Sequence, residues 1–248
     1  MRPIIKKIVL WVVVGVPALL IGGLLLIYLS LPDVADLLAH NPRATALMLQ
    51  RFKEAKNASK DLAIRQQWVS FDEIPKLLKE TIRVTEDAAF YQHQGVDLAE
   101  LKASFIKNWQ KGKYVRGAST ITQQLAKNLY LSTDKSVVRK IKEYLIARRL
   151  ENRLGKNRIF ELYLNVIEFG PGIFGVQAAA KYFFNKDVSR LNLEEIVRLA
   201  AVIPKPLKET PTRTSSWLKW KAGWILDTLR QYKYINQIEY QVVMVKFN

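Results

Sequence analysis

Apolar residues recur at helical spacing through most of the chain after residue 70. Between Ile159 and Ile167, five apolar side chains fall at positions i, i+3, i+4, i+7 and i+8, which predicts a helix with one buried face. The stretch 193–201 repeats this pattern, and the tryptophans within 217–224 predict another helix packed on a core. Alternation typical of a strand is scarce, with 241–247 as a candidate. The pattern predicts a mainly α-helical domain.

Residues 8–31 form an uninterrupted run of 24 residues without a charge. At about 1.5 Å per residue, a helix of this length crosses the roughly 30 Å hydrocarbon core of a bilayer. Arg2, Lys6 and Lys7 precede the run, which predicts a cytoplasmic N-terminus and an exported remainder. A cleaved signal peptide is the alternative, but the run is long for one and no small-x-small cleavage site follows it before Pro32. We therefore expect an uncleaved single-pass anchor.

The composition is strongly basic, with a formal net charge of +17. Such a charge predicts an anionic partner. For an exported domain, anionic lipid headgroups of a phospholipid membrane or a phosphorylated lipid substrate fit better than nucleic acid, which we do not expect as a partner. The sequence contains no cysteine, which excludes disulfides, thiolate nucleophiles and iron–sulfur clusters. Two histidines, His40 and His93, are too few for a three-histidine metal centre.

Two adjacent carboxylates, Glu86 and Asp87, stand between an apolar stretch and the aromatic pair Phe90 and Tyr91. Burial against apolar side chains raises the pKa of a carboxyl group, which a general acid or base near neutral pH requires. A solvated glutamate at the edge of a helix is the alternative. His93 by itself is typical of a packed structural histidine. These residues alone leave both interpretations open.

The segment 116–128 combines hydroxyl, amide and cationic side chains. Thr120 and Gln123 fit a capping box, so a helix is predicted to begin there. Thr120, Gln124 and Lys127 lie on one side of that helix, and free backbone N–H groups at its start favour an anion. An amphipathic surface helix is the alternative, and the residues do not decide between the two.

Glu143 lies four residues after Arg139 and three after Lys140, one turn along the same predicted helix face. The simplest interpretation is a surface ion pair that contributes at most about 0.5 kcal/mol. The alternative is a carboxylate held by cations beside a phosphate-binding site. Taken in isolation, the segment favours the surface pair.

In this order, the segments resemble the glycosyltransferase family 51 domain of the peptidoglycan glycosyltransferases, and within it the monofunctional enzymes. The stretches that carry the resemblance are EDAAFYQHQG (86–95), RGASTITQQLAKN (116–128), RKIKE (139–143), KNRIFELYLN (156–165), EFGPGIFGVQAAAKYFF (168–184) and LNLEEIVRLAAVIPKP (191–206). They span about residues 70–210. The combination of the first two stretches is highly specific, whereas either one by itself is less so.

The resemblance implies a lysozyme-like, mainly α fold with a head lobe and a smaller jaw lobe near the membrane. With the anchor, we expect a cytoplasmic start and transmembrane helix in 1–32, a connector in 33–70 and a glycosyltransferase domain in 71–248. The implied substrates are lipid II and the growing glycan strand, joined with inversion and with release of undecaprenyl pyrophosphate. The domain would lie on the outer face of a bacterial cytoplasmic (inner) membrane, with other cell-wall synthesis proteins as partners.

By the same resemblance, Glu86 would be the general base. Glu143 would be a second essential glutamate that orders cations or holds a divalent metal such as Mg²⁺ or Mn²⁺, and no other cofactor is expected. The residues implied to bind substrate are Asp87, Phe90, His93, Ser119, Thr120, Gln123, Gln124, Lys127, Lys135, Arg139 and Lys140. The last four would neutralise the pyrophosphate. Lys135 departs from the family, which usually has arginine there, so a bidentate contact becomes a point charge.

Two other functions remain open. A lytic enzyme that cleaves glycan with one glutamate as acid would explain Glu86 but not the cations within 127–140. A catalytically inert, membrane-tethered binding module would explain the charge but not Glu86 and Glu143. Two S-x-x-K sequences, at 132–135 and 216–219, match a transpeptidase pattern, but no KTG or SDN motif accompanies them. We therefore expect no transpeptidase domain.

Overall fold

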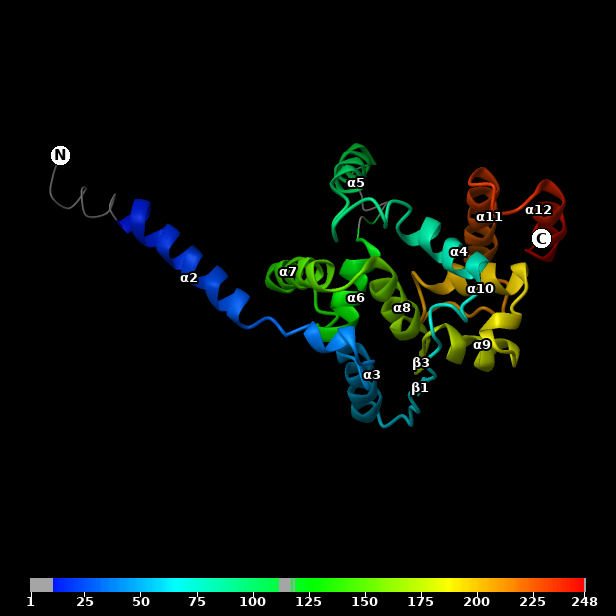
Figure 1. Ribbon diagram of the computed structural model, residues 1–248, viewed down its shortest axis with the longest axis horizontal. Helices are drawn as coiled ribbons and strands as arrows, with labels where there is room; N and C mark the ends of the chain where they lie inside the picture. Colours follow the sequence, from blue (N-terminus) through cyan, green and yellow to red (C-terminus); the bar gives the residue numbers. More distant parts are fainter. Residues whose placement is uncertain (1–10, 112–116, 118, 248) are drawn as a thin grey trace.

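Helices account for nearly all of the regular structure, which confirms the predicted mainly α fold (Figure 1). The computed structural model describes residues 11–111, 117 and 119–247. Its α-helices are α2 (Val16–Leu29), α3 (Ala46–Asn57), α4 (Lys76–Glu86), α5 (Leu98–Lys111), α6 (Ile121–Tyr130), α7 (Val137–Arg153), α8 (Lys156–Val166), α9 (Val176–Phe184), α10 (Leu193–Val202), α11 (Ser216–Gln231) and α12 (Gln237–Met244). Short π and 3₁₀ turns cover Trp11–Gly15, Ala35–Leu38, Val188–Arg190 and Val245–Phe247.

Three short strands, β1 (Arg65–Gln66), β2 (Glu168–Gly170) and β3 (Ile173–Phe174), form a sheet in the order β1-β3-β2. Strand β3 pairs parallel with β1 and antiparallel with β2.

The prediction of a strand over 241–247 is wrong, because this segment belongs to α12 and the turn after it. The helix begins at a capping box: the Glu239 N–H donates to Asn236, and the Asn236 N–H donates to the Glu239 side chain. This local stabilisation of a helix start outweighs a short run of alternating apolar residues.

Helix α6 lies at the centre of the helices that surround the candidate site. It packs against α3, α7 and α8, while α4, α10 and α11 pack on one another (Figure 1). The rings of Phe90, Phe160 and Tyr163 pack in series and join the turn after α4 to α8. Because the polar side chains of Thr122, Gln123 and Asn128 are buried as well as the apolar ones, α6 is not the amphipathic surface helix that was the alternative.

The segment 33–70, expected as a connector, contributes part of the packed body. Helix α3 packs against α6, and Leu47 and Met48 pack on Phe174 of β3. Arg51 of α3 makes a two-point ion pair with Glu168 of β2, with Nε–Oε1 and Nη2–Oε2 distances of 2.8 and 2.9 Å. This part of the chain therefore ties the small sheet to α6.

Helix α2 extends from the body as a single helix, and none of its residues is buried (Figure 1). Arg149 of α7 donates to the carbonyl oxygens of Tyr28 and Leu31 and so holds its C-terminal end. The start of the expected membrane span and its basic flank at residues 2–7 lie outside the described residues. In the part of the chain that the structure describes, no helix combines the length and the hydrophobicity that a bilayer crossing requires.

Candidate active site

Glu86 is the last residue of α4, and its position follows from the way that helix packs. Leu78 and Ile82 are completely buried, and Glu86 continues their row at i+4 and i+8, so the same periodicity carries its side chain inward. Gln124 Nε2 donates to Glu86 Oε2 at 3.0 Å, and the buried Tyr163 hydroxyl donates to Gln124 Oε1 at 3.1 Å. Both ends of the amide are therefore occupied, and Gln124 holds the carboxylate in one orientation.

The pKa of Glu86 is raised above its ordinary value, and burial is the main cause. The hydrogen bond from Gln124 and the charges of Lys221 and Lys127 act in the opposite direction, and the charge of Asp87 adds to the rise. Burial also raises the pKa of Tyr163 well above its ordinary value, so its hydroxyl remains a donor at neutral pH. Glu86 thus has the environment that a general base requires.

Lys221 of α11 is a second charged residue of this region, and our sequence analysis missed it. Its side chain is buried, burial lowers its pKa, and the nearby negative charge of Glu86 opposes that shift. A signal was present in the sequence: Lys221 follows Leu218 at i+3 and precedes Ile225 at i+4, on the buried side of the helix. A lysine on the apolar face of a helix requires a negative partner.

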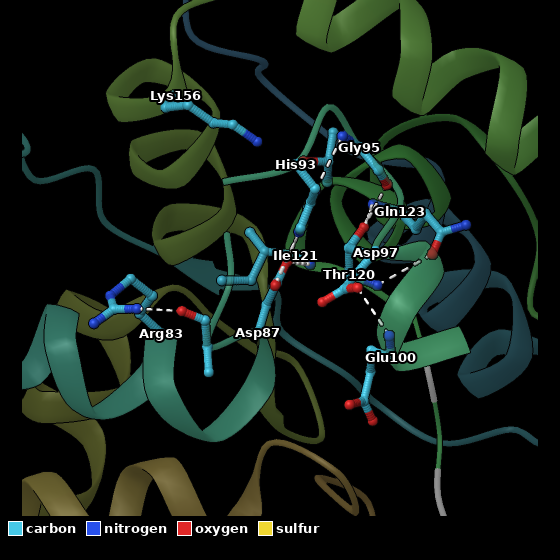
Figure 2. A network of polar contacts seen from close by, with 12 residues as sticks. Arg83, Asp87, His93, Gly95, Asp97, Glu100, Thr120, Ile121, Gln123 and Lys156 are labelled. Atoms are coloured by element: carbon cyan, nitrogen blue, oxygen red, sulfur yellow. Dashed lines mark hydrogen bonds and ion pairs between the residues drawn. The ribbon is translucent and has the colours of Figure 1, made fainter. Parts of the chain in front are cut away.

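Asp87 binds the protein itself and fixes the start of α6 (Figure 2). Its carboxylate accepts from the Ile121 N–H at 3.0 Å and lies 3.0 Å from His93 Nε2. The Gly95 N–H donates to His93 Nδ1, so Nε2 is the ring nitrogen that carries the proton toward Asp87. The anion expected at this helix N-terminus is therefore a carboxylate of the chain.

The predicted capping box at the start of α6 is confirmed. The Gln123 N–H donates to Thr120 Oγ1, and the Thr120 N–H donates to Gln123 Oε1. The Thr120 hydroxyl also donates to the Gly95 carbonyl oxygen at 2.7 Å (Figure 2). Phe90 is completely buried against Phe160. These three side chains, like those of Asp87 and His93, make their contacts within the protein.

Glu143 of α7 is buried, with both carboxylate oxygens paired to cations. Arg139 Nη1 donates to Oε2 at 2.5 Å, and Lys140 Nζ donates to Oε1. Lys140 Nζ also lies 3.1 Å from Ser119 Oγ, which joins the segment before α6 to the same cluster. The prediction of a surface ion pair is wrong, because the side chain of Glu143 is only 4% exposed.

Lys127 of α6 faces this cluster. Burial lowers its pKa, and the charges of Arg139 and Lys140 lower it further, while Glu143 opposes the shift. A cation under such conditions gains stability from an added anion. Lys135 is exposed in the segment between α6 and α7. Arg116 and Ala118 of the same sequence motif lie outside the described residues.

The carboxylate of Glu143 and its surroundings do not fit a divalent metal. Mg²⁺ and Mn²⁺ require free carboxylate oxygens, whereas both oxygens of Glu143 already accept from Arg139 and Lys140. Among residues 11–111, 117 and 119–247, no three acidic or histidine side chains gather as metal ligands would. In this structure the carboxylate of Glu143 therefore pairs with two cations.

Helix α6 connects the two charged regions. It carries Gln124, which contacts Glu86, and Lys127, which faces Glu143, at positions i and i+3 on one side. A carboxylate with a raised pKa and a cationic cluster thus flank a single helix.

Comparisons with known proteins identify the family of this chain. A family model described as Transglycosylase matches residues 53–230. The biosynthetic peptidoglycan transglycosylase of Methylobacillus flagellatus is 44% identical over 67% of this chain and 73% of its own length. That of Chromobacterium violaceum is 45% identical over the same shares, and that of Janthinobacterium sp. is 39% identical over 90% and 95%. The chain therefore belongs to the transglycosylase family, glycosyltransferase family 51, and is a peptidoglycan glycosyltransferase of cell-wall synthesis.

Proposed function

We propose that the protein polymerises lipid II into glycan strands by inverting transfer and releases undecaprenyl pyrophosphate. The observation that carries this proposal is the presence beside α6 of both a half-buried, amide-held glutamate and a cationic cluster. Glycosyl transfer from a lipid pyrophosphate needs both parts, a base for the acceptor and positive charge for the leaving group.

Glu86 acts as the general base in this proposal. Its carboxylate takes the proton of the 4-hydroxyl of the acceptor sugar as that oxygen forms a bond to the anomeric carbon of the growing strand. The bond from the anomeric carbon to the pyrophosphate oxygen breaks on the opposite face, which inverts the configuration. The raised pKa of Glu86 supports proton transfer near neutral pH, and Gln124 and Tyr163 support it by fixing the direction of the carboxylate.

The leaving pyrophosphate binds the cations around Glu143. We assign this role to Lys127, Lys135, Arg139 and Lys140, with Ser119 at the edge. The pKa of Lys127 is lowered mainly by burial and further by Arg139 and Lys140, and this supports the assignment because a bound phosphate stabilises the charged lysine. Glu143 positions Arg139 and Lys140 before substrate arrives, so little reorganisation is needed as charge develops on the leaving group.

In this proposal, the other residues implied by the family resemblance hold the helices and turns of the site in place. Asp87, His93 and Thr120 hold the start of α6, Gln123 completes its capping box, and Phe90 packs beneath the turn after Glu86. Their contacts with the protein support positioning over direct substrate contact. Gln124 orients the base.

We also propose that residues 8–31 anchor the protein in the bacterial inner membrane, with the N-terminus in the cytoplasm and the site outside. The uncharged run and the basic residues before it support this topology, as do the exposed apolar side chains of α2. Protein isolated from membranes should begin at or near Met1, as N-terminal sequencing would show. A soluble exported protein that begins near residue 32 would contradict the anchor.

Incubation of the full-length, detergent-solubilised protein with lipid II tests the central proposal. We expect glycan polymer together with free undecaprenyl pyrophosphate. Shortening of preformed glycan would instead indicate a lytic enzyme. Binding of lipid II without turnover would indicate an inert binding module, and either result would overturn the proposed reaction.

A further inference from the structure

Helix α11 carries two exposed tryptophans close to the candidate site. Trp220 is 60% exposed and Trp224 40% exposed, and residues four apart are neighbours on a helix surface. Exposed aromatic rings that lie side by side are characteristic of ligand and partner surfaces, whereas single exposed apolar residues are common.

Trp224 is linked to Glu86 through Lys221. Lys221 Nζ is 3.9 Å from the centre of the Trp224 ring, and the charge of Lys221 acts on Glu86. Helix α11 packs against α4, the helix that ends at Glu86 (Figure 1). The indole of Trp224 therefore contacts the ammonium of Lys221, and the charge of Lys221 reaches the carboxylate of Glu86.

Neighbouring groups hold both rings in place. The ammonium of Lys221 packs on the Trp224 ring, which remains partly open to solvent. Trp220 packs on Trp217 with ring centres 5.0 Å apart, and Lys205 Nζ lies over the Trp217 ring at 3.3 Å. Rings that are ordered before a ligand binds lose little conformational entropy on binding.

The residues around the rings favour a sugar over a lipid chain. Asp227 follows Trp224 at i+3 on the same helix. It pairs with Arg230 at 3.4 Å but stays exposed, so its carboxylate can also accept hydrogen bonds from hydroxyl groups. A face buried in hydrocarbon would carry a large cost for that charge. Pyranose rings combine apolar C–H faces, which pack on indole, with hydroxyl edges that bind carboxylates.

We propose that Trp220 and Trp224 form a platform on which sugar rings of the glycan strand stack beside Glu86. The ligand class is an uncharged or weakly charged chain of amino sugars, and Asp227 receives hydrogen bonds from its hydroxyl groups. This inference rests on the proposed role of Glu86 in glycan transfer. The pyrophosphate has its own site at Lys127 and Arg139, so the platform binds sugar alone.

The test is the binding of a lipid-free β-1,4-linked N-acetylglucosamine oligomer to the full-length protein in detergent, measured by calorimetry. Trp224→Ala should weaken binding about three- to tenfold, the range expected for loss of one aromatic contact, and Trp220→Ala should weaken it less. Trp224→Phe should keep most of the affinity, whereas Trp224→Leu should lose it. Tyr182→Ala is the matched control, since Tyr182 is 58% exposed on α9.

The Phe and Leu variants separate stacking from a structural role. If Trp224 only covers Lys221, Leu serves as well as Phe, and that result would overturn the platform. Unchanged oligomer affinity in Trp224→Ala would also overturn it, as would a loss of binding to phospholipid vesicles in place of the oligomer. Lipid II polymerisation by the wild-type protein is measured in parallel, so failure of the platform is distinguishable from failure of the proposed reaction.

Discussion

Glu86 and Glu143 are both largely shielded glutamates beside α6, but their partners differ. Glu86 accepts from the neutral amide of Gln124, and burial raises its pKa. Glu143 accepts from Arg139 and Lys140, which satisfy both of its oxygens. Burial favours the protonated form of the first carboxylate, whereas the second carboxylate holds two cations in place.

The comparison teaches that burial alone does not assign a role to a glutamate. A carboxylate next to neutral donors is suited to proton transfer, and one between cations is suited to placing them. Substitution of one carboxylate, or of one of its partners, should therefore make the two regions fail in different ways.

The largest effect is expected for Glu86→Gln. The amide keeps the shape of the side chain but cannot take a proton, so turnover of lipid II should fall by about 10²- to 10⁴-fold. Glu73→Gln, an exposed change just before α4, should leave turnover unchanged. Steady-state rates on both variants, with folding checked by circular dichroism, measure this difference.

A smaller effect with a different signature is expected for Glu143→Gln. Arg139 and Lys140 lose the charge that places them, so the affinity for a non-reactive lipid-pyrophosphate analogue should fall about tenfold or more, together with turnover. Glu161→Gln breaks an Arg158–Glu161 pair on α8 and serves as control. Normal analogue binding by Glu143→Gln would remove this residue from the leaving-group region.

Removal of a single cation of the cluster should weaken substrate binding by about tenfold or less. Lys127→Met should raise KM for lipid II, because a half-buried cation facing the pyrophosphate is lost. Lys135→Arg should be tolerated, since it keeps the charge and supplies the residue usual in the family. An unchanged kcat/KM in Lys127→Met would exclude that lysine from the site.

The smallest predicted effect is on stability and its pH dependence. Because the pKa of Glu86 is raised above 4.5 in the folded state, the folded protein binds more protons than the unfolded chain above about that pH. The folded state therefore loses stability as pH rises through the window above 4.5, and Glu86→Gln removes the loss. Its Tm should exceed the wild-type value at pH 7, and the difference should shrink as pH falls toward 4.5 and be absent below it. Glu73→Gln should show no such gain.

Local signals in the sequence predict the local parts of this molecule. The capping box of Thr120 and Gln123 marks the start of α6, and the apolar spacing from Ile159 marks the buried face of α8. A short alternation at 241–247 predicts a strand where α12 forms, because the capping signal at Asn236 lies outside the alternating stretch.

Contacts between distant segments were harder to predict. The family motifs identified Glu86 and Glu143, but the spacing around Glu143 alone favoured a surface pair, since burial by other helices is not visible in one turn of sequence. Lys221 belongs to α11 and meets Glu86 only through the packing of α11 on α4. Likewise, the pairing of Arg51 with Glu168 depends on how α3 docks on the sheet.

The most direct test of the central claim measures lipid II turnover and analogue affinity side by side in Glu86→Gln and Glu143→Gln. We predict that Glu86→Gln loses turnover but binds the lipid-pyrophosphate analogue nearly as well as the wild type, whereas Glu143→Gln loses affinity as well as turnover. Near-normal polymerisation by Glu86→Gln would contradict its role as the base. Loss of analogue binding in Glu86→Gln alone would mean that the two glutamates exchange the roles assigned to them.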